Sequence, residues 1–88
     1  MYKIELKPRV IIIFDKLSKK ERSRLLKIRK KIISISKNPF ASYKFLKKPL
    51  QGINRVHIDK HFVLTFRIDH SKRRMIIEDF DHHDKIYL

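Results

Sequence analysis

The sequence contains no cysteine and only one glycine among its 88 residues. Without cysteine the chain forms no disulfide and has no thiolate for catalysis, which is typical of proteins in a reducing compartment. A single glycine excludes the Gly-rich phosphate loops of nucleotide-binding domains. No apolar run approaches the roughly 20 residues that cross a bilayer, and charges interrupt every segment that could serve as a signal peptide. We therefore expect a cytoplasmic protein without a membrane partner.

The sequence is also poor in acids, with nine Asp and Glu against 23 Lys and Arg and a formal net charge of +14. Such a charge favours an acidic partner, but charge alone does not distinguish nucleic acid, an anionic membrane and an acidic protein. A basic surface without a polyanionic partner is the alternative. The chain has room for one hydrophobic core, and we expect a single domain over residues 1–88.

The N-terminal part predicts a strand followed by a helix. Residues 2–6 alternate between apolar and polar side chains, as expected for a β-strand. Pro8 is well placed for the first turn of a helix, which we predict over residues 8–17. One stripe of this helix is apolar, and two isoleucines, Ile11 and Ile12, face away from it. The run of β-branched residues leaves a buried strand as the alternative.

A second helix is predicted from Ser18 to about Lys37. Ser18 and Glu21 have the spacing of a capping box, in which each side chain satisfies a backbone N–H at the helix start. Asn38 and Pro39 then end the helix. We expect its apolar side to pack on the core and its basic side to face solvent, phosphate or an acidic partner. The apolar side consists of Leu25, Leu26, Ile28, Ile32, Ile33 and Ile35.

Three segments in the C-terminal part, residues 53–59, 61–68 and 73–80, alternate with a period of two. Because the turns between them are short and polar, we predict an antiparallel three-strand meander. Residues 40–51, which precede it, are expected to form a loop. With the N-terminal strand, the meander makes a four-stranded sheet that carries both helices on one face, which is an α+β fold.

The face of the meander that points away from the helices is the candidate functional surface. The other face is apolar and is expected to lie under the helices. The C-terminal part of the chain also holds all five histidines. The candidate surface carries Arg55, His57, His61 and Arg67, together with Val63 and Thr65.

Several segments carry a family resemblance. The second helix ends in Asn38-Pro39-Phe40, residues 48–52 (KPLQG) lead into the strands, and the chain closes with HDKIY at residues 83–87. With the strand over residues 62–69 and the order of the elements, they resemble the RelE/ParE superfamily of bacterial and archaeal toxins over nearly the whole chain. The resemblance implies a toxin that cleaves mRNA, commonly in the ribosomal A site. It also implies a hetero-oligomer with an acidic RelB-like antitoxin.

Two positions depart from the RelE pattern. Val63 stands where that pattern has an arginine, and His82-His83 replaces the His-Arg of the common ending. A histidine pattern similar to that of the YafQ branch instead matches His57, His61 and His83. The resemblance therefore implies histidine chemistry.

Cleavage of RNA by this route needs a base, an acid and cations, but no cofactor. We assign His83 and His57 as the acid/base pair and His61 as a further candidate, because imidazole titrates near neutrality. Tyr87 is expected to stack on a base or to orient one. Contacts to phosphate are expected from Arg55, Arg67, Lys47 and Lys48.

Other functions stay open at this point. A zinc site would draw on His57, His61, Asp81, His82 and His83, but a turn separates the first two and no thiolate joins them, so we expect no metal. A ParE-like inhibitor of DNA gyrase shares the fold and needs no histidines. A non-catalytic basic module that binds nucleic acid is a further alternative, and its binding would fall steeply with salt.

Overall fold

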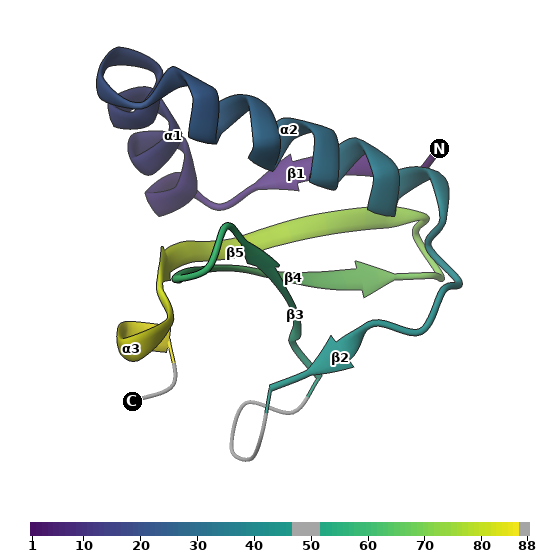
Figure 1. Ribbon diagram of the computed structural model, residues 1–88. Helices are drawn as coiled ribbons and strands as arrows, with labels where there is room; N and C mark the ends of the chain where they lie inside the picture. The colour runs from purple at the N-terminus through teal and green to yellow at the C-terminus, as the bar shows by residue number, and fades with distance from the viewer. Residues whose placement is uncertain (47–51, 87–88) are drawn as a thin grey trace.

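A five-stranded sheet carries two helices on one face and a short third helix on the other side of one end (Figure 1). The computed structural model describes residues 1–46 and 52–86. Its elements are β1 (Lys3–Leu6), α1 (Pro8–Lys20), α2 (Arg22–Lys37), β2 (Lys44–Phe45), β3 (Asn54–Ile58), β4 (Phe62–Asp69), β5 (Arg74–His82) and α3 (His83–Ile86). The predicted fold class, with an N-terminal strand, a helix pair and a meander, is confirmed.

The strands lie in the order β1-β5-β4-β3-β2. β3, β4 and β5 form the predicted antiparallel meander, and β1 pairs in parallel with β5. The sheet has one strand more than predicted, because Lys44 and Phe45 pair with Arg55 and Asn54 inside the segment expected to be a loop. β1 and β2 therefore lie at the two edges of the sheet.

The junction between the two long helices differs from the prediction. Ser18 lies inside α1, and its hydroxyl donates a hydrogen bond to the carbonyl oxygen of Asp15 at 2.6 Å. The helix continues to Lys20 and breaks at Glu21, whose backbone N–H still bonds to Leu17. No side-chain hydrogen bond caps the start of α2. The capping box is therefore wrong, since both of its residues serve the end of α1 or the junction itself.

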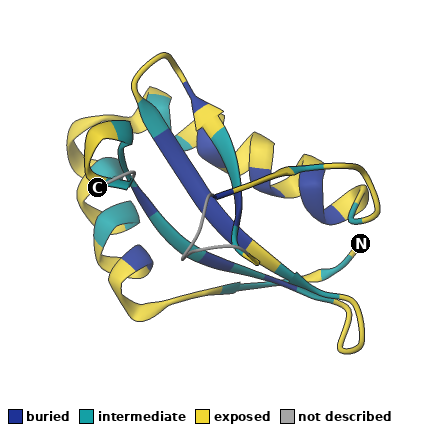
Figure 2. Cartoon of the chain, turned by 90° about the horizontal axis from the view of Figure 1, so that it is seen from below, coloured by how far each residue is buried: buried dark blue, intermediate teal, exposed yellow. Residues whose placement is uncertain are grey.

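The core lies between the helices and the sheet. Phe66 is fully buried, and the apolar face predicted for β4 points towards the helices as expected. Figure 2, seen from the side opposite α1 and α2, shows buried residues along the central strands. The core residues are Val10, Ile28, Ile32, Ile35, Ile58, Leu64, Phe66, Met75, Ile77 and Phe80.

The outer side of the helix pair is partly apolar. Ile11 and Ile12 are 55% and 58% exposed, as the helical interpretation of this segment predicts. Leu26 and Ile33 are also exposed, at 54% and 40%, and the expectation that they pack on the core is wrong. Leu26 precedes buried Ile28 by about 200° around the helix, at roughly 100° per residue, so it points away from the sheet. Among the described residues, no helix is long and apolar enough to cross a membrane.

A β-bulge between Thr65 and Phe66 changes the register of β4 against β5. On the side of the hairpin turn, Phe66 pairs with Ile77, whereas beyond the bulge Thr65 pairs with Asp79. Because β5 has one residue more than β4 across the bulge, each residue of β4 beyond it pairs one position later in β5 than it would without the bulge. Phe62 consequently lies opposite His82.

Candidate active site

Three histidines come together at one end of the sheet. His61 lies in the turn between β3 and β4, and His82 and His83 lie where β5 passes into α3. The ring centroids are 5.8 Å apart for His61 and His82, 6.0 Å for His61 and His83, and 4.7 Å for His82 and His83. His61 is exposed and the other two rings are partly exposed. We call these three residues the histidine cluster.

Backbone pairing brings the histidine cluster together. The backbone N–H of His83 donates to the carbonyl oxygen of His61 at 2.8 Å, and Nδ1 of His83 lies 3.1 Å from the same oxygen. His82 pairs with Phe62 across the ladder, and its ring meets the Phe62 ring edge-on with centroids 5.7 Å apart. The three imidazoles are thus placed by the β4–β5 register.

Asp84 places a carboxylate against two of the rings. Its Oδ1 lies 2.8 Å from Nε2 of His83, and its Oδ2 lies 3.5 Å from Nδ1 of His82. Both ring nitrogens of His83 therefore face acceptors, and a doubly protonated ring satisfies both of them. An imidazolium held in this way can serve as a general acid.

A basic groove of about 510 Å³ lies beside the histidine cluster, between the start of α2 and the β3–β4 turn. The cluster and the groove share His61. The groove is lined by four cationic side chains and two carboxylates, so its lining is net positive, which suits a phosphate backbone. Besides His61, its residues are Lys20, Glu21, Ser23, Arg24, Lys27, Asp59 and Lys60.

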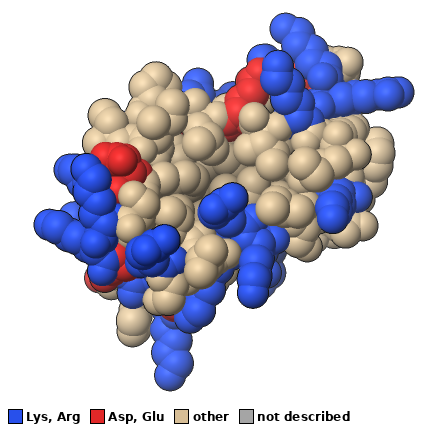
Figure 3. Space-filling model, turned by 90° about the horizontal axis from the view of Figure 1, so that it is seen from above, with Lys and Arg blue, Asp and Glu red and all other residues tan. Residues whose placement is uncertain are grey.

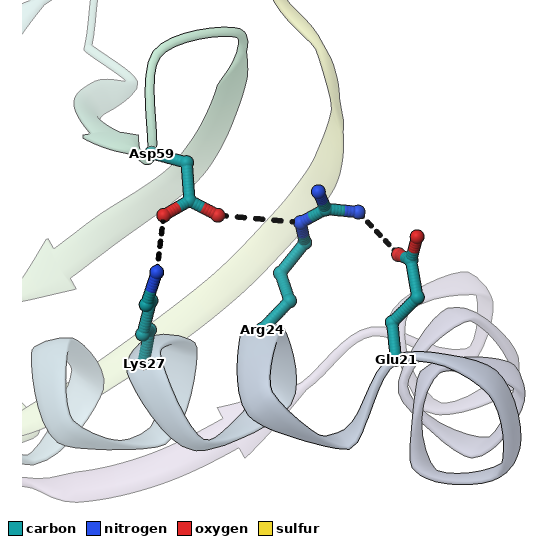
Figure 4. A network of polar contacts seen from close by, with 4 residues as sticks. All are labelled: Glu21, Arg24, Lys27 and Asp59. Atoms are coloured by element: carbon teal, nitrogen blue, oxygen red, sulfur yellow. Dashed lines mark hydrogen bonds and ion pairs between the residues drawn. The ribbon is translucent and has the colours of Figure 1, made fainter.

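Asp59 ties the β3–β4 turn to α2 (Figure 4). Lys27 Nζ lies 2.7 Å from one carboxylate oxygen, and Arg24 Nε lies 3.4 Å from the other. Arg24 also pairs with Glu21, and its guanidinium carbon lies 4.1 Å from the centroid of the Phe62 ring. The hydrogen bond from Lys27, aided by that from Arg24, lowers the pKa of Asp59. The turn that carries the cluster's exposed histidine is thus anchored by ion pairs.

The face predicted to be the functional surface is more closed than expected. Val63 and Thr65 are buried, because α3 packs against β4 and β5. The guanidinium of Arg67, at Nε, forms an ion pair with Glu78 at 2.9 Å. A hollow of about 250 Å³ remains on this face, lined by Leu46, Ile53, Thr65, Glu78, Asp79, Lys85 and Ile86.

The predicted acid/base pair is not brought together by any contact among residues 1–46 and 52–86. His57 is exposed in β3 and pairs with Val63 across the ladder, whereas His83 adjoins His61. Arg55 pairs with Thr65 in the same ladder. Three further predicted residues, Lys47, Lys48 and Tyr87, lie outside the described residues.

Two members of this site, His82 and Asp84, are missing from the catalytic residues that the sequence predicts. The sequence places His82 only among the candidate zinc ligands. The signal that could have found His82 is its position next to His83 at the end of a strand. Within a strand, consecutive side chains point to opposite faces, whereas beyond its end two consecutive rings can lie together. The register that sets His82 opposite Phe62 depends on the bulge.

Comparison with known proteins agrees with the fold. RelE4, a candidate toxin of Methanocaldococcus jannaschii, is 48% identical over 87 residues, which cover 99% of this chain and 92% of that protein. A YoeB/ParE toxin from Agrobacterium tumefaciens superposes with a TM-score of 0.82 at 18% identity, covering 92% of this chain and 98% of the other. The YoeB-YefM toxin–antitoxin heterotetramer from Staphylococcus aureus contains a chain that superposes with a TM-score of 0.79 at 18% identity, covering 94% of this chain and 98% of that one.

No protein-family model matches the chain. The identity to RelE4 nevertheless spans almost the whole of both sequences. The chain therefore belongs to the RelE/ParE superfamily of toxins from toxin–antitoxin systems. The similarity to the solved structures, at 18% identity, reflects a shared fold.

Proposed function

We propose that this chain is a toxin that cleaves mRNA in the cytoplasm, on the ribosome, and thereby stops translation. The observation that carries the proposal is the adjacency of His61 and His83 beside a basic groove, in a chain of the RelE/ParE superfamily. Imidazole can donate or accept a proton near neutral pH, and the groove supplies cations for the RNA backbone. Imidazoles for proton transfer and cations for the RNA backbone, which RNA cleavage requires together, thus lie at the same end of the sheet.

The proposed reaction is a transesterification that needs no metal ion. A neutral imidazole takes the proton from a ribose 2′-hydroxyl, and the 2′-oxygen attacks the adjacent phosphorus. The bond from phosphorus to the 5′-oxygen breaks, and a protonated imidazole donates its proton to that oxygen. The products are a 2′,3′-cyclic phosphate and a 5′-hydroxyl. His83, which faces Asp84, is the proposed acid, and His61 or His57 is the base.

The proposed RNA contacts extend from the histidine cluster in two directions. In the basic groove, the ammonium groups of Lys20 and Lys60 offset phosphate charge. On the sheet face opposite the long helices, Arg55 and Arg67 keep their proposed role, although phosphate would compete with Glu78 for Arg67. Lys47 and Lys48 are further proposed phosphate contacts, and Tyr87 is the proposed ring for a base.

The proposed partner that silences the toxin is an acidic antitoxin. In Figure 3, which views the helix side, tan surface lies between groups of Lys and Arg side chains. Four apolar side chains of α1 and α2 are exposed and available for contact with a partner: Ile11, Ile12, Leu26 and Ile33. An antitoxin helix with an apolar stripe and acidic flanks would complement this apolar and basic surface. The S. aureus YoeB toxin, which shares this fold, forms a heterotetrameric complex with the antitoxin YefM.

The proposal is tested in a translation extract that contains a defined mRNA. New 5′ ends are mapped after the chain is added, with ribosomes and with ribosomes removed. We expect cuts that depend on the chain and on ribosomes. Intact RNA combined with blocked DNA supercoiling would overturn the proposal in favour of a gyrase inhibitor.

A further inference from the structure

The histidine cluster contains one imidazole more than the proposed cleavage reaction uses. One ligand nitrogen from each of His61, His82 and His83 can be chosen so that all three lie within 4.8 Å of one another. We infer that these three side chains form a binding site for a transition-metal ion of the Zn²⁺ type. The sequence predicted no metal, and of the five candidate zinc ligands that it offered, the structure brings together these three without His57 and Asp81.

The backbone holds the three ligands in place before any ion arrives. His82 and His83 are consecutive, and the hydrogen bond from the His83 N–H to the His61 carbonyl fixes the turn against the end of β5. The ion pairs of Asp59 with Lys27 and Arg24 hold the same turn from the other side. Binding would therefore require side-chain rotation and no change of fold.

The donor set selects the kind of ion. Neutral imidazole nitrogens bind Zn²⁺, Ni²⁺, Co²⁺ and Cu²⁺, whereas Mg²⁺ and Ca²⁺ prefer oxygen ligands. In a tetrahedral zinc site with Zn–N bonds of about 2.0–2.1 Å, neighbouring nitrogens lie about 3.3–3.4 Å apart. The present separations of up to 4.8 Å can close to that value by small rotations about the side-chain torsions of the three partly or fully exposed rings.

Asp84 lies beside the site and contacts two of its rings directly. Its two oxygens lie 2.8 Å from Nε2 of His83 and 3.5 Å from Nδ1 of His82, so the shorter contact opens when an ion binds that nitrogen. Nδ1 of His83 faces the carbonyl of His61, so this bond fixes the tautomer in which Nε2 is free to bind metal. The carboxylate also offsets part of the ion's charge on a chain of net charge +14.

Occupation of this site would have a consequence for activity, which rests on the proposed function. An ion bound to His61 and His83 would occupy the nitrogen lone pair that the base needs to accept a proton. It would also displace the proton that the acid has to donate. Micromolar Zn²⁺ should then inhibit the wild-type toxin reversibly, and a chelator should restore cleavage. The metal site would act as an off switch for the nuclease.

Calorimetric titration of the untagged full-length chain with Zn²⁺, after treatment with a chelator, tests the site directly. We expect one equivalent to bind, and His82→Gln to weaken binding at least tenfold. His57→Gln and His70→Gln are matched controls that should bind as the wild type does. Co²⁺ provides a second probe, because its visible absorption intensifies in a four-coordinate site. Absence of one-to-one binding, or binding unchanged by His82→Gln, would overturn the site.

Two further measurements keep the outcomes separate. Circular dichroism without metal checks that His82→Gln is folded, and His61→Gln, at an exposed turn position, replaces it if it is not. The titration contains no RNA, so its failure counts against the metal site alone. A metal-free chain that binds Zn²⁺ yet leaves mRNA intact on ribosomes would instead count against the proposed nuclease.

Discussion

The backbone N–H of His83 donates a hydrogen bond to the carbonyl oxygen of His61 across 22 positions of sequence, at 2.8 Å. This bond joins the end of β5 to the β3–β4 turn, and it does not involve either imidazole. The position of the histidine cluster is therefore set by the main chain. Side chains at these two positions can be exchanged without loss of the framework that holds them.

This arrangement predicts that His61→Ala and His83→Ala fold normally. Exposed positions such as His61 usually change stability by less than about 0.5 kcal/mol, and the two side-chain contacts that His83→Ala removes are each worth about 1 kcal/mol. Urea titration should give free energies of unfolding within about 0.5 kcal/mol of the wild type for His61→Ala and about 2 kcal/mol for His83→Ala. Unfolded variants would show that the rings support the fold.

The same substitution should cost much more stability at Phe66 than at Phe40. Phe66 is fully buried in the core, so Phe66→Ala should lower the free energy of unfolding by about 3–5 kcal/mol. Phe40 is 79% exposed and its ring contacts the rings of His70 and Tyr2, so Phe40→Ala should cost about 1 kcal/mol or less. Denaturant titration of both variants measures the difference. Equal losses would contradict the position of the core.

The ion pairs of Asp59 should make the free energy of unfolding depend on pH in the acidic range. Its pKa in the folded chain lies below the usual value of 3.8, chiefly because of the hydrogen bond from Lys27. Its contribution is therefore complete above that value and is lost as pH falls through the lower, folded pKa. The difference in unfolding free energy between wild type and Asp59→Asn should stay constant from pH 7 to 5 and shrink below about pH 4.

A matched background isolates the cause of that dependence. In chains that already carry Lys27→Gln, the principal hydrogen bond to Asp59 is gone. Asp59→Asn should then produce a smaller difference with a weaker pH dependence. A difference that is identical in both backgrounds would rule out Lys27 as its source.

Ile12 tests where the proposed antitoxin binds. The wild-type chain should recover a small acidic protein from its native host, and Ile12→Gln should bind that protein at least tenfold more weakly, since loss of a buried isoleucine contact costs about 1.4 kcal/mol or more. Ser34→Gln changes an exposed polar position of α2 and is the control. Both variants should unfold as the wild type does. Equal affinities would place the antitoxin elsewhere.

The sequence predicted the elements whose apolar period is unbroken. The alternation in β4 and the stripe of α1 both set the buried face correctly, because period and burial coincide there. The capping box at Ser18 failed, since the helix-forming Lys19 and Lys20 continue α1 past it. Lys44 and Phe45 gave no strand signal, because two residues are too few to show a period.

The site was harder to predict than the fold, because it depends on register. Counting back from the pair Asp69 and Arg74 without a bulge would set Phe62 opposite Asp81, whereas the bulge sets it opposite His82. Nothing in the local sequence marks that extra residue, as no glycine stands near it. The sequence predicts that the histidines act as a group, but it does not show that the ring adjacent to His83 belongs to His61, which is brought there by the backbone pairing.

The central claim is that imidazoles of the histidine cluster cleave RNA. The most direct test is the rate of ribosome-dependent mRNA cleavage in excess chelator of transition-metal ions, compared between wild type, His83→Ala, His61→Ala and the remote control His70→Ala. We predict that His83→Ala slows cleavage roughly 10²- to 10⁴-fold, that His61→Ala slows it measurably, and that His70→Ala does not. Full activity in a folded His61→Ala/His83→Ala double variant would contradict the claim.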